Sequence, residues 1–137
     1  MNYLSIGTLA MYGAGAIHWA GVVVNVTAPW VYAYRKNLPG SDAMRQIFVG
    51  QAVWVTIMLA AMGGVCVKYG TVLCSSVGLG HYLAVFLLVL WVARLIMQIA
   101  FYRSDTRVAH PARYFIFLSA FTYQVVVFGA AAFGVLA

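Results

Sequence analysis

The stretch GHYLAVFLLVLWVARLIMQIAFY, residues 80–102, decides the fold that we predict for this chain. Its side chains are almost all apolar or aromatic, and its one charged residue is Arg94. A helix needs about 20 mostly apolar residues to cross a lipid bilayer. The stretch is long enough, and we therefore predict a transmembrane helix over residues 80–102.

The whole chain has the same apolar character. Of its 137 residues, 65% are hydrophobic and 7% are charged, and the mean hydropathy is +0.95. Since soluble domains carry about 25% charged residues, this composition predicts a single integral membrane domain. The net charge is +6. Because the basic residues lie between apolar segments, we expect them to contact membrane lipid headgroups rather than nucleic acid.

Three further apolar segments predict helices at about residues 5–33, 46–67 and 114–135. Strands that span lipid need an alternating pattern and closure into a barrel, whereas these apolar runs are continuous. Short connections make consecutive helices antiparallel neighbours. The predicted fold is therefore all-α, an up-down four-helix transmembrane bundle. Pro39-Gly40 in the first connection and Pro111 at the start of the fourth helix are typical of such boundaries.

The basic residues predict the orientation of the bundle. Those of the first and third connections are Arg35, Lys36, Arg45, Arg103, Arg107 and Arg113. The second connection has only Lys68. The positive-inside rule therefore places the first and third connections in the cytoplasm and both termini in the periplasm of a bacterial inner membrane. The N-terminus lacks the basic region of a signal peptide, so we expect its apolar segment to remain as a helix.

Polar side chains inside the helices are the candidates for a functional site, because they are costly in lipid. They, with one adjacent tryptophan, are Arg94, Gln98, Trp91, Asn25, His18, Gln51, Tyr123 and Gln124. Counted along the helix rise, most fall in the cytoplasmic half. Trp91, Arg94 and Gln98 share one helix face. If all four helices turn these groups inward, they form one ligand-binding cluster around Arg94.

The charge of Arg94 has no carboxylate partner within the helices, since Asp42 and Asp105 both lie in connections and Glu is absent. Four kinds of partner remain open. They are a lipid phosphate reached by snorkelling, helix carbonyls with neutral polar side chains, an anionic ligand, and a carboxylate from another protein.

The chain offers little for catalysis or cofactors. His18, His81 and His110 fall at three different depths, which argues against haem held by two of them. The two Asp residues are far apart in sequence, which argues against paired-carboxylate chemistry. We assign no catalytic residue, no metal site and no resident cofactor, and keep a lipid or quinone as the ligand class. For Cys66 and Cys74, a disulfide and two free thiols both remain open.

Three short motifs carry a resemblance: Pro29-Trp-Val, Arg45-Gln-Ile-Phe and Leu90-Trp-Val-Ala-Arg-Leu-Ile-Met-Gln. By these motifs and its layout, the chain resembles an uncharacterised family of small bacterial four-helix integral membrane proteins. The resemblance implies the same topology and no mechanism. It also suggests that Arg45, Gln46, Arg94 and Gln98 lie together near the cytoplasmic face.

These observations favour a non-enzymatic membrane protein that acts as a subunit of a larger membrane complex or as a homo-oligomer. One alternative is a binding protein for an anionic lipid, a quinone or another amphiphile, using the candidates around Arg94. A small membrane enzyme or redox subunit is the second alternative.

Overall fold

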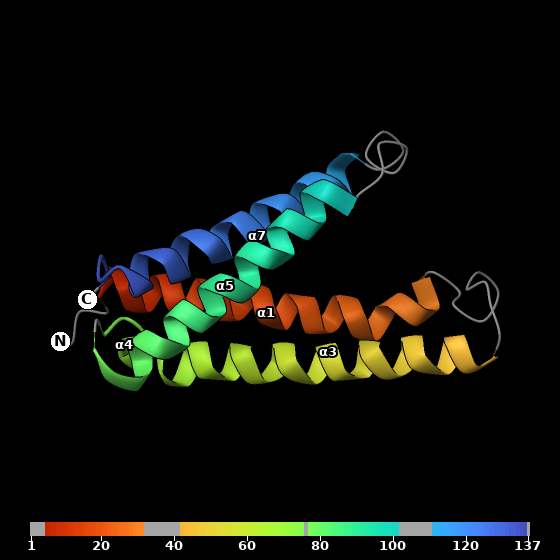
Figure 1. The fold of residues 1–137 in the computed structure, drawn as a ribbon, viewed down its shortest axis with the longest axis horizontal. Coiled ribbons are helices and arrows are strands. Elements are labelled where there is room, and N and C mark those ends of the chain that lie inside the picture. The colour runs from red at the N-terminus through yellow and green to blue at the C-terminus, as the bar shows by residue number, and fades with distance from the viewer. Residues whose placement is uncertain (1–4, 32–41, 76, 102–110, 137) are drawn as a thin grey trace. The chain divides into compact units, whose positions relative to one another are not determined.

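The computed structural model describes residues 5–31, 42–75, 77–101 and 111–136 (Figure 1). These residues form five helices and contain no strand. The helices are α1 (Ile6–Val31), α3 (Asp42–Lys68), α4 (Gly70–Leu73), α5 (Gly78–Phe101) and α7 (Pro111–Ala132). The predicted all-α class is confirmed. The Pro39-Gly40 turn and His110 lie outside the described residues.

Each of the four long helices is long and apolar enough to cross a membrane. They fit a multi-pass membrane protein, as the composition predicts. The predicted boundaries agree with the observed ones to within a few residues. The largest shifts are at the start of α3 and at both ends of α7. Asp42 and Pro111 already belong to the helices, and α7 ends at Ala132. Proline suits the first turn of a helix, because the N–H it lacks would have no intrahelical acceptor there.

The short helix α4 lies in the second connection, which we expected to be a loop. Two glycines allow the chain to turn from α4 into α5. Gly78 has a φ of 72°, a conformation that glycine adopts without the steric cost of a Cβ atom. A Cβ on Gly80 would collide with the backbone carbonyl of Val72. Glycine at these positions therefore brings α4 directly against the start of α5.

The chain divides into two compact units, which we describe separately. The first comprises Met1–Ala14 and Tyr69–Ala137, and the second comprises Gly15–Lys68. The helix α1 contributes its first turns to the first unit and the rest to the second.

In the first unit, α5 packs along α7 (Figure 1). The buried side chains of the two helices mostly recur at intervals of three, four or seven residues, which keep side chains on one helix face. They are Ala84, Leu87, Trp91 and Gln98 of α5, with Tyr114, Phe121, Gln124, Val127, Phe128, Ala131 and Ala132 of α7. The first turns of α1 complete the unit, since Met11 lies against Gly70 and Gly7 lies against Cys74.

In the second unit, α1 and α3 lie side by side and run antiparallel (Figure 1). Successive contacts lie closer to the C-terminus of α1 and closer to the N-terminus of α3. Gly15 lies beside Val67, Trp19 beside Gly63, and Gly21 beside Leu59. Glycines at these positions allow the two backbones to approach closely, as is common between membrane helices.

Candidate functional site

Two neighbouring polar residues of α7 bind the backbone of α1 in the first unit. The hydroxyl of Tyr123 donates to the carbonyl of Ala10 at 3.1 Å. The amide Nε2 of Gln124 donates to the carbonyl of Ala14 at 3.0 Å, and the Gln124 side chain is fully buried. Ala10 and Ala14 are one helical turn apart and share a face. The hydrogen bonds from Tyr123 and Gln124 therefore join α7 to two successive turns of α1, which gives both residues a structural role.

Arg94 lies over an aromatic ring that we did not single out from the sequence. Its guanidinium carbon is 4.8 Å from the centroid of the Phe121 ring. The ring of Trp91 lies 5.5 Å from the same ring, measured between centroids. A cation over the face of an aromatic ring is attracted by the ring quadrupole. Phe121 therefore helps to stabilise the charge of Arg94, although the Arg94 side chain remains exposed.

Phe121 belongs to an aromatic row on α7. The centroid of Phe117, one turn earlier, lies 6.0 Å from that of Phe121. Their spacing of four residues places both on one face of a helix, and that pattern is visible in the sequence. The sequence does not indicate that this face turns toward α5 and Arg94.

Gln98 lies one turn beyond Arg94 on α5 and is 1% exposed. Its amide Nε2 is buried and makes no hydrogen bond to a described residue. Trp91, Arg94 and Gln98 are separated by three and four residues, so they lie along one face of α5. Trp91 and Gln98 are buried on this face, and Arg94 is exposed.

The remaining candidates belong to the second unit and differ in exposure. His18 is fully buried, and its Cβ lies 3.2 Å from the position that a Cβ on Gly63 would occupy. Asn25 is half-buried between α1 and α3, whereas Gln51 is exposed on α3. The eight candidates are therefore divided between the two units. The same holds for the motif residues Arg45 and Gln46 on one side and Arg94 and Gln98 on the other.

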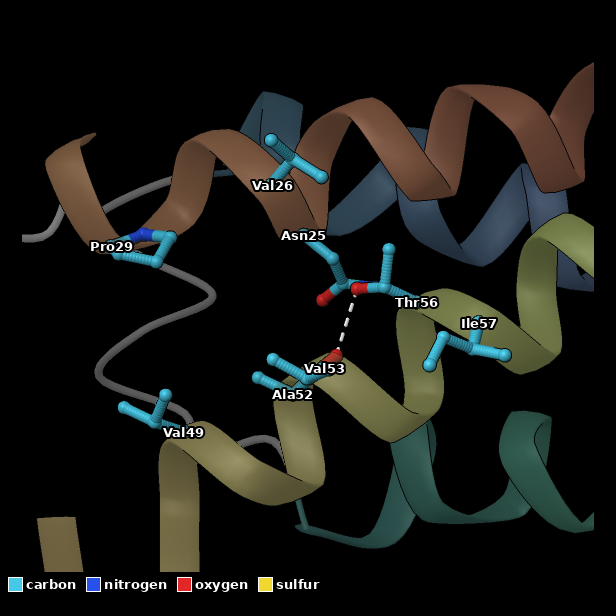
Figure 2. A pocket seen from close by; sticks show the side chains of 8 residues that line it. All are labelled: Asn25, Val26, Pro29, Val49, Ala52, Val53, Thr56 and Ile57. Carbon is cyan, nitrogen blue, oxygen red and sulfur yellow. Dashed lines mark hydrogen bonds between the residues drawn. The ribbon is translucent and has the colours of Figure 1, made fainter. Parts of the chain in front are cut away.

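A groove opens between α1 and α3 with a cavity volume of about 320 Å³ (Figure 2). Its walls are formed by Asn25, Val26 and Pro29 of α1 and by Val49, Ala52, Val53, Thr56 and Ile57 of α3. Most of these side chains are apolar. The Thr56 hydroxyl donates to the carbonyl of Ala52 at 2.8 Å, so the Asn25 carboxamide is the polar group left facing the groove (Figure 2).

The two cysteines are free thiols, and both are buried. Burial raises the pKa of the Cys74 thiol, because the charged thiolate is poorly solvated there. Within the described residues, no group of three or more His, Cys, Asp or Glu side chains comes together to hold a metal ion.

We compared the chain with protein-family models, curated proteins and solved structures, and none of them matches. The resemblance to small bacterial four-helix membrane proteins therefore stays a prediction. The roles of the candidate residues rest on the geometry of this chain.

Proposed function

We propose that this protein is a multi-pass membrane protein that works by self-assembly, with one face of α3 as its contact surface. This surface, the outer face of α3, consists of Ile47, Gly50, Gln51, Trp54, Met58 and Ala61. Their spacing places them together on the side of α3 away from the groove and from α1. All of them are exposed, and α3 is the least buried of the four long helices.

The exposure of Gln51 is the observation that carries the proposal. Gln51 lies six residues after Arg45, or about 9 Å along the helix axis. With Arg45 at headgroup level, this position falls within the hydrocarbon. The side chain of Gln51 makes no hydrogen bond to another described residue. A carboxamide left in hydrocarbon costs free energy, and glutamine side chains that hydrogen-bond across helices remove this cost.

The neighbours of Gln51 suit helix association. A Cβ on Gly50 would meet no other atom within 4 Å, so the backbone is open to close approach there. Small residues at such positions are typical of contacting membrane helices. In a symmetric dimer the same face meets its own copy, so two Gln51 side chains can hydrogen-bond to each other.

Cross-linking tests the contact surface. In a variant with Cys66 and Cys74 replaced by alanine, Met58→Cys places a thiol on the outer face of α3. Val53→Cys places one on the groove side of the same helix. In liposomes at low protein density, we expect oxidation to link chains through position 58 and not through position 53. Equal cross-linking at both positions, or none at either, contradicts the proposal.

A substitution pair tests the role of Gln51. Gln51→Leu should weaken dimerisation about tenfold, which corresponds to one interhelical hydrogen bond of about 1.4 kcal/mol. Gln46→Leu is the matched control, because Gln46 is an exposed glutamine next to Arg45, at the level where water is available. Single-molecule photobleaching in liposomes measures the dimer fraction. If both variants behave like the original chain, Gln51 does not mediate assembly.

The orientation forms part of the same proposal, with the first and third connections in the cytoplasm and both termini in the periplasm. The excess of Lys and Arg in these connections supports it. Single cysteines at Ser41 and Ser104 should react with a membrane-impermeant maleimide only in inside-out vesicles. A cysteine at Ser75 should react in right-side-out spheroplasts. The opposite pattern would reverse the assigned topology.

A further inference from the structure

The groove between α1 and α3 has walls suited to a hydrocarbon chain. Where the two helices touch, glycines occupy the interface and allow close contact, as at Gly15, Gly21 and Gly63. Beyond Gly21 no further glycine lies on the α1 side of the contact, and the groove opens between Asn25 and Pro29 on α1 and Ala52 on α3. The short side chain of Ala52 does not fill the space between the helices.

Arg45 lies on the same face of α3 as the groove. It precedes Val49 by four residues, Ala52 by seven and Thr56 by eleven, and these intervals keep side chains on one helix face. Arg45 is half-buried, unlike its exposed neighbours Gln46 and Ile47. A permanent cation therefore lies on this face of α3, about one turn before Val49, the first α3 residue that lines the groove. In α1 and α3 together the one acidic residue is Asp42, at the start of α3.

The distance from Arg45 to the inner end of the groove matches one membrane leaflet. From Arg45 to Thr56 the helix rises about 16 Å. One leaflet contributes about 15 Å to the hydrocarbon core of a bilayer. A lipid with its phosphate beside Arg45 would thus extend one acyl chain past Val49 and Ala52 to the level of Asn25.

We propose that this groove binds one acyl chain of an anionic phospholipid, whose phosphate contacts the guanidinium of Arg45. The charge of Arg45 selects the anionic headgroup, and the apolar walls hold the chain. This site is distinct from the cluster around Arg94 that the sequence suggested for amphiphile binding. The proposal rests on the insertion of the helices into a bilayer and not on self-assembly.

Lipid retention tests the site. The full chain is reconstituted with equal amounts of phosphatidylglycerol and phosphatidylethanolamine, extracted in mild detergent and analysed by native mass spectrometry. We expect the original chain to retain one phosphatidylglycerol molecule. Arg45→Gln should reduce this preference about fivefold, the share of one basic residue near an anionic headgroup. Arg113→Gln removes an exposed cation at the equivalent end of α7 and should have no effect.

A pair of bulky substitutions tests the groove itself. Val49 and Val55 are each 47% exposed, and only Val49 lines the groove. Val49→Trp should abolish retention of both lipids, whereas Val55→Trp should leave it unchanged. Circular dichroism and thermal unfolding check that each variant is folded. Ala52→Leu, which fills the middle of the groove, provides a second variant if Val49→Trp does not fold.

The outcomes separate specific binding from general lipid contact. Equal loss of lipid in Arg45→Gln and Arg113→Gln, or in Val49→Trp and Val55→Trp, would indicate lipid around the protein without a site. No retained lipid on the original chain overturns the proposal as well. Gln51→Leu should retain phosphatidylglycerol even where it no longer dimerises, so failure of self-assembly is distinguishable from failure of this site.

Discussion

Gln124 of α7 donates a hydrogen bond from Nε2 to the backbone carbonyl of Ala14 in α1, 3.0 Å away, across 110 residues of sequence. The same carbonyl accepts the N–H of His18 in a regular helix. The bond from Gln124 is therefore an additional one, which ties two helices together at a fully buried position.

Loss of this bond should lower stability. Gln124→Leu keeps a side chain of similar length and removes the donor, and we expect it to lower the free energy of unfolding by about 1 kcal/mol. Thr122→Val is the control, since the exposed Thr122 hydroxyl donates only within its own helix, to Leu118. It should change stability by less than about 0.5 kcal/mol. Thermal unfolding in detergent measures both, and equal effects would refute the role assigned to Gln124.

The neighbouring contact predicts a steric effect at Gly13. A Cβ at this position would collide with the hydroxyl of Tyr123, so Gly13→Ala should destabilise the protein by about 1–3 kcal/mol. Gly64→Ala is the control, because a Cβ at Gly64 meets nothing within 4 Å. Tyr123→Phe removes the colliding oxygen, and Gly13→Ala should cost less in that background. Additive effects in the double variant would show that the two residues do not meet.

Arg94, Trp91 and Phe121 form a stacked group whose loss should be measurable. Phe121→Leu removes one cation–π contact and two aromatic pairs, and we expect it to cost about 2 kcal/mol. Phe86→Leu is the control, at a phenylalanine of α5 that is 53% exposed. Urea unfolding in mixed micelles compares the two. Similar losses in both variants would mean that the stacking contributes no stability of its own.

Cys74 should titrate above the ordinary thiol range. In the Cys66→Ala variant it is the single thiol, and its alkylation by iodoacetamide should stay slow at pH 8 and rise only at higher pH. Because burial raises its pKa in the folded protein, its contribution to stability is complete below the unfolded thiol pKa of about 8.5 and is lost as pH rises further. Ser75→Cys in a cysteine-free background should react faster. If the denatured, unreduced original chain yields no free thiols, Cys66 and Cys74 form a disulfide.

The helices could be predicted from the sequence because length and apolar composition alone determine whether a segment can cross a bilayer. Residues 80–102 correspond closely to α5, which is Gly78–Phe101. The helix α4 was missed because four residues leave no periodic signal. The partner of Arg94 was missed for a different reason. Counting along the chain gives the depth of a residue, but not which helix its side chain faces.

The same reasoning applies to the candidate site. The sequence suggests Gln51 and Gln98 as members of one inward-facing cluster, yet Gln51 is exposed and Gln98 is buried. Helices that are apolar on all sides carry no polar face to show their rotation. Contacts between helices, such as that of Tyr123 with Ala10, determine the rotation and become visible only in the structure.

The division of α1 between the two units has a consequence for how the protein is made. The second unit is one continuous piece of chain, Gly15–Lys68, so α1 and α3 can pair as a hairpin while the ribosome is still synthesising the rest. The first unit needs both ends of the chain, because Tyr123 and Gln124 bind turns of α1 that were made more than a hundred residues earlier. The emergence of α7 is therefore the event that completes the first unit, and a chain cut short before it would leave the carbonyls of Ala10 and Ala14 without these bonds.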